Sequence, residues 1–359
     1  MKKSRSILSL VSITCVVLAS VTLAFTTAWA QSAPAAKPTV KPAELSLALM
    51  MPPSHTRWIL STDPWIKNLE GRTGGKVKIV PYFAEALAKS SEIYAATSTG
   101  IADMGEVVTY HVAGQFPLTD FFLLPGLEIT SSLMASRLHW HLTTKVPEFG
   151  AQYAATKMIV TSSHGGDAVV LMSTKPIRTL EELKGKKLFI GSPVGVAIAN
   201  ALGCTPVQMS MQDVYMSVEK GVLDGVISSV TLLSSRKFGE IMKHVTYGPT
   251  FGGAPWIFFM NRDKWSKLPP DVQKAFDDLG GAHGADFFGK GMLKEEEDAR
   301  QESVKKYGCT FYKLPPDELG RWVKRVNVVQ DDWVNKMESK KLPGRKVMDE
   351  YRRFVKSAK

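Results

Sequence analysis

Two stretches of the chain, EIYAATSTGIAD at residues 92–103 and DVYMSVEKGVLD at residues 213–224, repeat one pattern at one spacing. In each stretch an acidic residue, an apolar residue and a tyrosine begin a segment that runs to a glycine, and a short apolar segment follows. A helix ending at the glycine fits this pattern, because glycine enters the left-handed conformation of a helix C-cap without a Cβ penalty. The acidic residue suits the positive end of the helix dipole. The repeat therefore predicts two lobes of similar construction.

The segments around each copy of the repeat predict parallel β-sheets. Apolar runs without strict alternation are typical of parallel strands buried on both faces. Helical segments near residues 57–70 and 194–202 separate these runs, and the order strand, helix, strand indicates the α/β class. The predicted strands are 46–50, 77–81 and 101–108 in the first lobe, and 188–190, 205–209 and 222–230 in the second.

Two strongly β-prone runs, 168–173 and 256–261, are predicted to cross from one lobe to the other and back. From residue 263 onward the chain is helical and amphipathic, with apolar residues at helical spacing within 322–337. The predicted organisation is a signal peptide at 1–30, a flexible lead-in at 31–43, lobe one at 44–174 plus 256–300, lobe two at 175–255, and C-terminal helices bracing the lobes at 301–359.

The N-terminus has the features of an export signal. A basic start (Lys2, Lys3 and Arg5) precedes an uncharged, largely apolar stretch to about residue 25, and the triplet Ala-Trp-Ala at 28–30 predicts cleavage after Ala30. An uncleaved membrane anchor is the alternative, since the uncharged stretch is long enough to span a bilayer. The cleavage motif favours an exported protein that resides in the periplasm.

Composition and motifs exclude several function classes. The net charge is +11, yet there is no Arg-rich tract and no alternation of aromatic and basic residues of the kind that binds nucleic acid. Solvated helix faces explain the basic residues, with docking near anionic headgroups as the alternative. The sequence holds no Walker loop, His-Glu-x-x-His, Gly-x-Ser-x-Gly or Cys-x-x-Cys motif, so we expect no enzyme, no cofactor and no metal. Whether Cys204 and Cys309 form a disulfide is left open by the sequence.

Strand ends locate the candidate ligand site. In open parallel sheets ligands bind beyond the carboxyl ends of the strands, and in two facing lobes these ends line a shared cleft. His139 and His141 are set aside, because residues two apart on a helix point away from each other. The candidate ligand-binding residues at or near predicted strand ends or crossings are His55, Trp58, Tyr110, His164, Phe189, Ser228 and Trp256, and Arg236 is a further candidate as a cation.

Several motifs then match a known family in order along nearly all of the predicted mature chain: GIADMG (100–105), LPG (124–126), TKPI (174–177), LEELKGKKL (180–188), LGCTPV (202–207) and LPPD (268–271). In combination they resemble the solute-binding subunits of tripartite ATP-independent periplasmic (TRAP) transporters of the dicarboxylate-binding type. The resemblance implies a two-lobed, type II-like periplasmic binding protein whose lobes are joined by crossing strands and a long C-terminal helix. It also implies closure on a small organic ligand, and delivery to small and large membrane subunits.

The sequence departs from this family at one important position. The resemblance implies an arginine after Leu188 that clamps the carboxylate of an organic acid, and this chain has Phe189 there. Arginine binds a carboxylate through two parallel hydrogen bonds, which phenylalanine cannot make.

Two explanations stay open. A neutral or aromatic ligand could stack on Phe189, with Trp58, Tyr110 or Trp256 nearby. Alternatively, another cation holds a carboxylate, with His164, Arg236 and His55 as the candidates.

The predicted function is that of a periplasmic receptor that captures a small organic solute in the interlobe cleft and delivers it to TRAP membrane subunits. A receptor that presents its ligand to a membrane sensor is the alternative, since both use the closed state. A periplasmic enzyme would need a nucleophile with a base, or a metal cluster, and the sequence offers neither.

Overall fold

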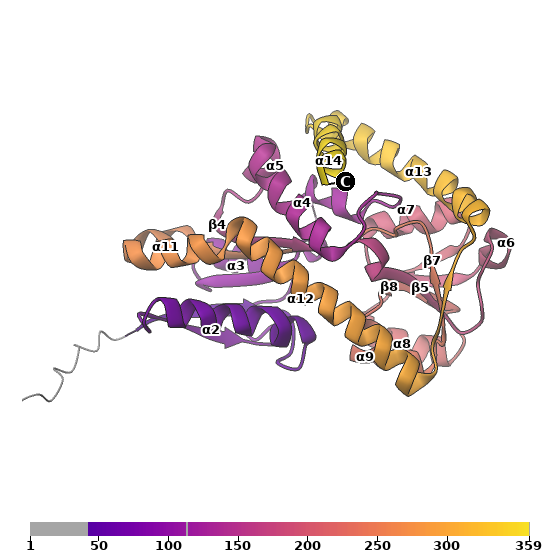
Figure 1. The fold of residues 1–359 in the computed structure, drawn as a ribbon, viewed down its shortest axis with the longest axis horizontal. Helices are drawn as coiled ribbons and strands as arrows, with labels where there is room; N and C mark the ends of the chain where they lie inside the picture. The colour runs from indigo at the N-terminus through magenta and orange to yellow at the C-terminus, as the bar shows by residue number, and fades with distance from the viewer. Residues whose placement is uncertain (1–41, 113, 359) are drawn as a thin grey trace, which may run out of the picture. The chain divides into compact units, whose positions relative to one another are not determined.

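Two mixed β-sheets organise the part of the chain that the computed structural model describes, residues 42–112 and 114–358 (Figure 1). The predicted signal peptide and most of the lead-in lie outside these residues. The first sheet has the strand order β2-β1-β3-β10-β4, and the second has the order β11-β9-β5-β8-β6-β7. The strands are β1 (Ala43–Leu49), β2 (Val77–Tyr82), β3 (Met104–Val108), β4 (Thr156–Ser163), β5 (Val169–Ser173), β6 (Lys187–Ile190), β7 (Thr205–Val207), β8 (Gly225–Ser229), β9 (His244–Tyr247), β10 (Pro255–Asn261) and β11 (Thr310–Lys313).

Each sheet combines a parallel trio of strands with an antiparallel strand contributed by the crossing chain. In the first sheet β1 runs parallel to β2 and β3, and β10 joins β3 antiparallel. In the second sheet β6 runs parallel to β7 and β8, and β5 joins β8 antiparallel. The chain crosses to the second sheet between β4 and β5 and returns between β9 and β10, so the predicted crossing strands are confirmed. Hydrogen bonding places β5 in the second sheet, although the predicted boundary at residue 174 includes it in lobe one.

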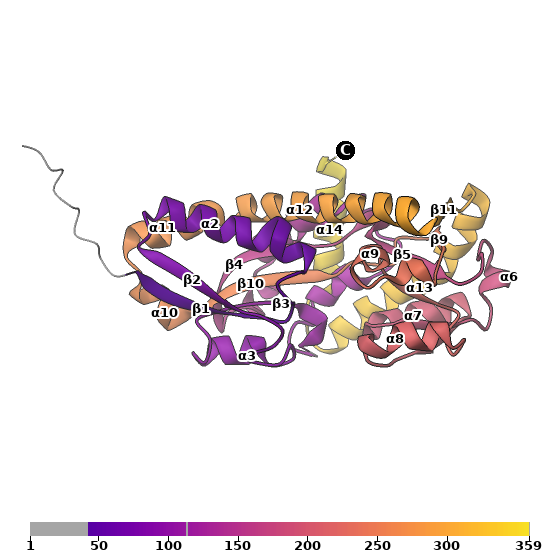
Figure 2. The same ribbon diagram turned by 90° about the horizontal axis from the view of Figure 1, so that it is seen from below.

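The helices cover both faces of the sheets (Figure 2). Side chains of α2, α11 and α12 form one core cluster with the first sheet, and α8 packs on the second sheet in another. A third cluster contains residues of both sheets together with α4, α7, α13 and α14, so the two lobes share a core. The helices are α2 (Asp63–Arg72), α3 (Ile93–Ser98), α4 (Ser132–Lys145), α5 (Pro147–Ala151), α6 (Leu180–Leu183), α7 (Pro193–Leu202), α8 (Met211–Glu219), α9 (Leu232–Ser235), α10 (Arg262–Lys267), α11 (Pro270–Leu279), α12 (Gly281–Glu302), α13 (Pro316–Ser339) and α14 (Gly344–Ala358).

The sequence repeat is a structural repeat. Helix α3 ends in a turn at Gly100 with φ +85°, and α8 ends in a turn at Gly221 with φ +73°. After each glycine the next two backbone N–H groups donate to one carbonyl of the last helical turn, Ala96 in the first copy and Ser217 in the second. Because the turn takes up the residues after each glycine, the strands begin later than predicted. β3 begins at Met104 and not at 101, and β8 begins at Gly225 and not at 222.

The aspartate that closes each repeat ties the following strand to its neighbours. The Oδ2 atom of Asp103 accepts from the backbone N–H of Ser46 at 2.9 Å, and Oδ2 of Asp224 accepts from that of Lys187 at 2.9 Å. Ser46 lies on β1 and Lys187 on β6, the equivalent strands of the two sheets. The repeat therefore fixes both the helix end and the strand pairing.

Helix α12 contacts elements of both lobes. It packs against α4, β4 and the π-helical turn Trp58–Thr62 in the first lobe, and against α9 in the second. Figure 1 shows it running along both sheets before the chain enters β11. Helix α12 ends at Glu302, and residues 303–307 form a π-helical turn. Within the described residues, no helix combines the length and the apolar character that crossing a membrane requires.

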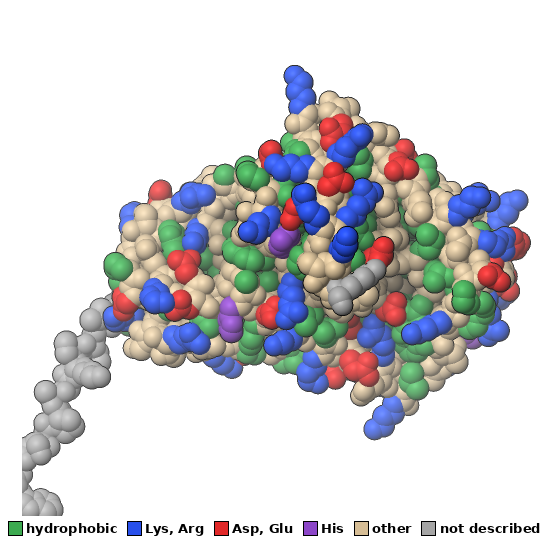
Figure 3. Space-filling model, turned by 45° about the horizontal axis from the view of Figure 1, so that its top comes forward, with side chains coloured by type: hydrophobic (Ala, Val, Ile, Leu, Met, Phe, Trp, Pro, Cys, Tyr) green, Lys and Arg blue, Asp and Glu red, His purple; other side chains and the backbone are tan. Residues whose placement is uncertain are grey.

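Basic side chains are spread among acidic ones. Figure 3 shows Lys and Arg mixed with Asp and Glu over one face. Several lysines pair with an aspartate four residues away on the same helix, as Lys274 does with Asp278 at 2.8 Å. Exposed pairs of this kind contribute roughly 0.3–0.5 kcal/mol each. The arrangement agrees with the interpretation of solvated helix faces.

The two connections between the sheets lie against each other without spare room. The backbone N–H of His164 donates to the carbonyl of Ala254 at 3.2 Å. A Cβ atom on Gly253 would lie 1.9 Å from the carbonyl oxygen of His164, a distance that no real structure accommodates. Glycine at 253 is therefore required for the two crossing segments to pack.

We expect Gly253→Ala to lower the free energy of unfolding by about 2 kcal/mol or more, because the added methyl group must displace backbone. Gly320→Ala is the matched control, since a Cβ at Gly320 on α13 meets nothing within 4 Å. Urea denaturation of the two variants checks this. Equal stability of both variants would contradict the close packing of the connections.

His139 on α4 is a buried structural residue. Its Nδ1 lies 3.1 Å from the carbonyl oxygen of Ser162, and its Nε2 lies 3.0 Å from the hydroxyl of Tyr153. Burial lowers the pKa of His139 from 6.5 to about 3, so the ring is neutral in the folded protein. His141 instead bonds Glu350, with 2.6 Å between Nε2 and Oε1.

The lowered pKa of His139 predicts a pH-dependent contribution to stability. The unfolded chain takes up a proton on this histidine below pH 6.5, whereas the folded chain does so only near pH 3. The contribution of neutral His139 to the free energy of unfolding is fully present above pH 6.5. As the pH falls below 6.5, this contribution decreases by about 1.4 kcal/mol per pH unit. Unfolding free energies of wild type and His139→Gln between about pH 7 and pH 4 measure it. The difference between the two proteins should change with this slope; a constant difference would contradict the assignment.

Candidate ligand-binding site

Four predicted site residues converge at one end of the first sheet. β1 and β3 end at Leu49 and Val108, and Trp256 at the start of β10 pairs with Val108, which places it at the same end. His55 and Trp58 follow β1, Tyr110 follows β3, and the Trp58 and Tyr110 side chains pack on the core cluster that contains Trp256. The carboxyl ends of the strands thus gather aromatic side chains, as the strand-end argument predicts.

Four of the ring side chains at the strand ends form two edge-to-face pairs. The Trp58 ring lies 4.8 Å from that of Phe83 at 87°, and the Trp256 ring lies 6.5 Å from the imidazole of His55 at 64°. Burial raises the pKa of Tyr110 to about 12, so its hydroxyl stays neutral. Sequence reasoning had not selected Phe83. The group presents apolar faces and edges that suit a planar ligand.

Arg57 is the main polar residue that sequence reasoning missed. Its side chain is 2% exposed, and its Nε donates to Oε1 of Glu106 at 2.6 Å. The guanidinium carbon lies 4.3 Å from the Trp256 ring centroid and 5.0 Å from that of Phe288. A signal was present: Glu106 is an acidic residue inside an otherwise apolar buried strand, and such a residue requires a buried partner.

Breaking this buried pair should be costly. We expect Glu106→Gln to lower the free energy of unfolding by about 3 kcal/mol, because Arg57 is left buried without an anionic partner. Glu181→Gln is the matched control: Glu181 pairs with Arg321, but its side chain is 66% exposed, so its loss should change stability far less. Chemical denaturation compares them. Similar values for both would contradict the role of burial.

His55 contributes a hydrogen bond and not a charge. Its Nδ1 accepts from the backbone N–H of Arg57 at 3.1 Å, which leaves the proton of the neutral ring on Nε2. Burial lowers the pKa of His55; the carboxylate of Glu295 opposes this, and the positive charges of Arg57 and Arg236 act with it. Arg236 follows α9 in the second lobe.

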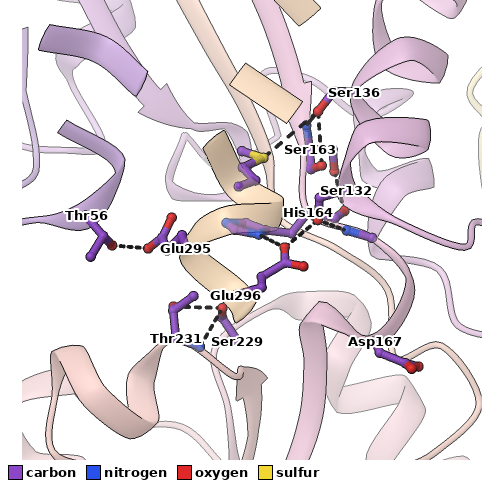
Figure 4. A network of polar contacts seen from close by, with 12 residues as sticks. Thr56, Ser132, Ser136, Ser163, His164, Asp167, Ser229, Thr231, Glu295 and Glu296 are labelled. Carbon is purple, nitrogen blue, oxygen red and sulfur yellow. Dashed lines mark hydrogen bonds and ion pairs between the residues drawn. The ribbon is translucent and has the colours of Figure 1, made fainter. Parts of the chain in front are cut away.

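Two adjacent glutamates of α12, Glu295 and Glu296, bond different parts of the chain (Figure 4). Glu295 accepts a hydrogen bond from Thr56 in the loop after β1. Glu296 bonds His164, with 2.9 Å between Oε1 and Nδ1, and also accepts from Ser132. His164 therefore serves the connection between the lobes in this structure, and its predicted contact with ligand stays a prediction.

The predicted site residues of the second lobe do not lie in one group. Phe189 is 3% exposed and lies in the core beside Val214 and Val226, which is the position of an ordinary core residue. Ser228 is half-buried on β8, and Arg236 is exposed. For ligand contact these three residues remain predictions.

Cys204 and Cys309 are both free within the described part of the chain, and they lie in different core clusters. Burial raises the pKa of Cys204 to about 11. No group of three or more His, Cys, Asp or Glu side chains in residues 42–112 and 114–358 is arranged to hold a metal ion.

Two lobes with repeated α/β construction, crossing strands, bracing helices and a polar and aromatic group at the strand ends define a two-lobed solute-binding protein. Residues 49–337 match the model of DctP, the bacterial extracellular solute-binding protein family 7, and the chain belongs to this family. The resemblance to TRAP solute-binding proteins is thereby confirmed. The family consists of solute-binding receptors.

Known relatives agree with this placement. The protein YiiZ of Salmonella typhimurium is 28% identical over 69% of this chain and 75% of its own length. A TRAP periplasmic solute-binding protein of Desulfovibrio salexigens is 27% identical, with a TM-score of 0.79 over 88% of this chain and 96% of that chain. A TRAP solute-binding protein of Rhodoferax ferrireducens, solved with copurified benzoate, is 23% identical, with a TM-score of 0.80 over 88% and 98% of the chains.

Proposed function

We propose that this receptor captures a small aromatic monocarboxylate and delivers it to the small and large membrane subunits of a TRAP transporter. The observation that carries the proposal is the group at the carboxyl ends of the first sheet, where Trp58, Tyr110 and Trp256 share one cluster beside His55 and Arg57. Aromatic rings bury a planar ligand and orient it by offset or edge-to-face contact. Polar groups that fix orientation are few in such sites, as here.

Charge supports an acidic ligand. Arg236 acts on His55 from the second lobe, and Arg57 lies beside His55 in the first. An anion between the lobes would interact with cationic side chains from both sides. The structural relative from Rhodoferax ferrireducens binds benzoate, which combines a planar ring with one carboxylate. The proposal unites the two explanations left open by Phe189: the ligand is aromatic, and other cations hold its carboxylate.

Export completes the proposed function. The basic start, apolar stretch and Ala-Trp-Ala triplet support a signal peptide cleaved after Ala30 and residence in the periplasm. The relatives named above that have a stated role are TRAP proteins, which favours delivery to a transporter over presentation to a membrane sensor.

A thermal-shift screen tests the ligand class. Benzoate, mandelate, succinate, benzamide and glycerol are compared, and the aromatic acids should raise the melting temperature most. A ligand at 100 times its Kd adds about 2.7 kcal/mol, because it binds only the folded state. Trp58→Ala should reduce the shift, and the matched variant Trp265→Ala should retain it. A shift with glycerol or succinate alone would overturn the proposal.

A further inference from the structure

Two buried donors at the strand ends lack an acceptor. Nη1 of Arg57 and Nε1 of Trp256 have no hydrogen-bond partner among the described residues, and the two residues are 2% and 6% exposed. Guanidinium and indole groups donate and cannot accept. A buried donor without an acceptor is destabilising, because it has lost its hydrogen bonds to water. Two such donors on stacked side chains therefore require acceptor atoms from another molecule.

The surroundings of Arg57 leave only one edge of the guanidinium available. Nε donates to Oε1 of Glu106 at 2.6 Å, and Nη2 donates to Oγ of Ser162 at 3.2 Å. The rings of Trp256 and Phe288 lie over the guanidinium. The second oxygen of Glu106 accepts from Thr62 at 2.8 Å, so that carboxylate is already engaged on both oxygens. Nη1 is the donor that remains.

The two unpartnered donors lie at the carboxyl ends of the strands, where a ligand is expected to bind. Trp256 pairs with Val108 at the carboxyl end of β3 and with Ser162 on β4, and Arg57 follows the loop after β1. The His55 ring lies beside Trp256, with 6.5 Å between the ring centroids, and its Nδ1 accepts from the backbone N–H of Arg57. A carboxylate has two acceptor oxygens and so can satisfy both unpartnered donors.

We propose that Nη1 of Arg57 and Nε1 of Trp256 form the carboxylate subsite of this receptor, on the first lobe, in place of an arginine at position 189. The inference rests on the proposed function and assigns its carboxylate to named atoms. It also predicts a preference for one carboxylate over two, because Nη1 and Nε1 are two donors, enough for the two oxygens of one carboxylate, and the neighbouring rings of Trp58 and Tyr110 are apolar.

The test compares acid and amide pairs, benzoate with benzamide and mandelate with mandelamide, by isothermal titration calorimetry. Trp256→Phe removes the Nε1 donor and keeps a ring over Arg57, and Trp265→Phe is the matched control in the same lobe. Arg57→Lys keeps the charge and removes the Nη1 donor. Loss of one charge-assisted hydrogen bond should weaken binding of the acids by about tenfold to a hundredfold. Binding of the amides should change less, so the acid-to-amide ratio falls.

The outcomes separate the two proposals. If wild type binds the acids and both Trp256→Phe and Arg57→Lys keep the wild-type ratio, the subsite is overturned and the proposed function stands. If wild type binds neither acid, both are overturned. Circular dichroism of each ligand-free variant checks folding. Should Arg57→Lys fail to fold, Trp256→Phe decides alone, because it leaves the pair of Arg57 and Glu106 intact.

Discussion

The burial of charge on helix α12 constrains the rest of the molecule. Glu295 and Glu296 are 4% and 2% exposed, and a buried carboxylate is tolerated only when donors surround it. The donors come from separate parts of the chain: Thr56 after β1, Ser132 on α4 and His164 in the first connection between the sheets. These bonds fix the loop that holds His55 and Arg57 relative to the connection between the lobes. The site and the crossing point are thus positioned by the same helix.

The crossing point itself is built from backbone contacts. Glycines at 252 and 253 bring one connection against Leu123 and His164, where a side chain would collide with carbonyl oxygens. Around this point the lobes share a core through α13 and α14, whose Trp333 and Tyr351 both contact Phe121. Any closure of the lobes must therefore occur by small rotations within tightly packed segments, since the surrounding core resists deformation.

The sequence predicted those features that depend on local patterns. The repeated helix, glycine and strand follow from residues close in sequence, and the crossing strands follow from their composition and position, although their antiparallel pairing was not predicted. Strand starts at Met104 and Gly225 were missed, because the turn after each glycine consumes residues that look apolar and strand-like. Arg57 was missed because its partners Glu106, Ser162 and Trp256 are remote in sequence. Phe189 was weighed as a pocket residue from its position at a strand end, and only packing reveals its core neighbours.

The buried thiols have a practical consequence for observing the molecule in motion. Cys204 and Cys309 are sealed in separate cores, and burial raises the pKa of both, which keeps them in the unreactive thiol form. A cysteine introduced on the surface of each lobe would then react with a fluorophore or spin label with little background from Cys204 and Cys309. Distances between labels on the two lobes can then be measured without replacing Cys204 or Cys309.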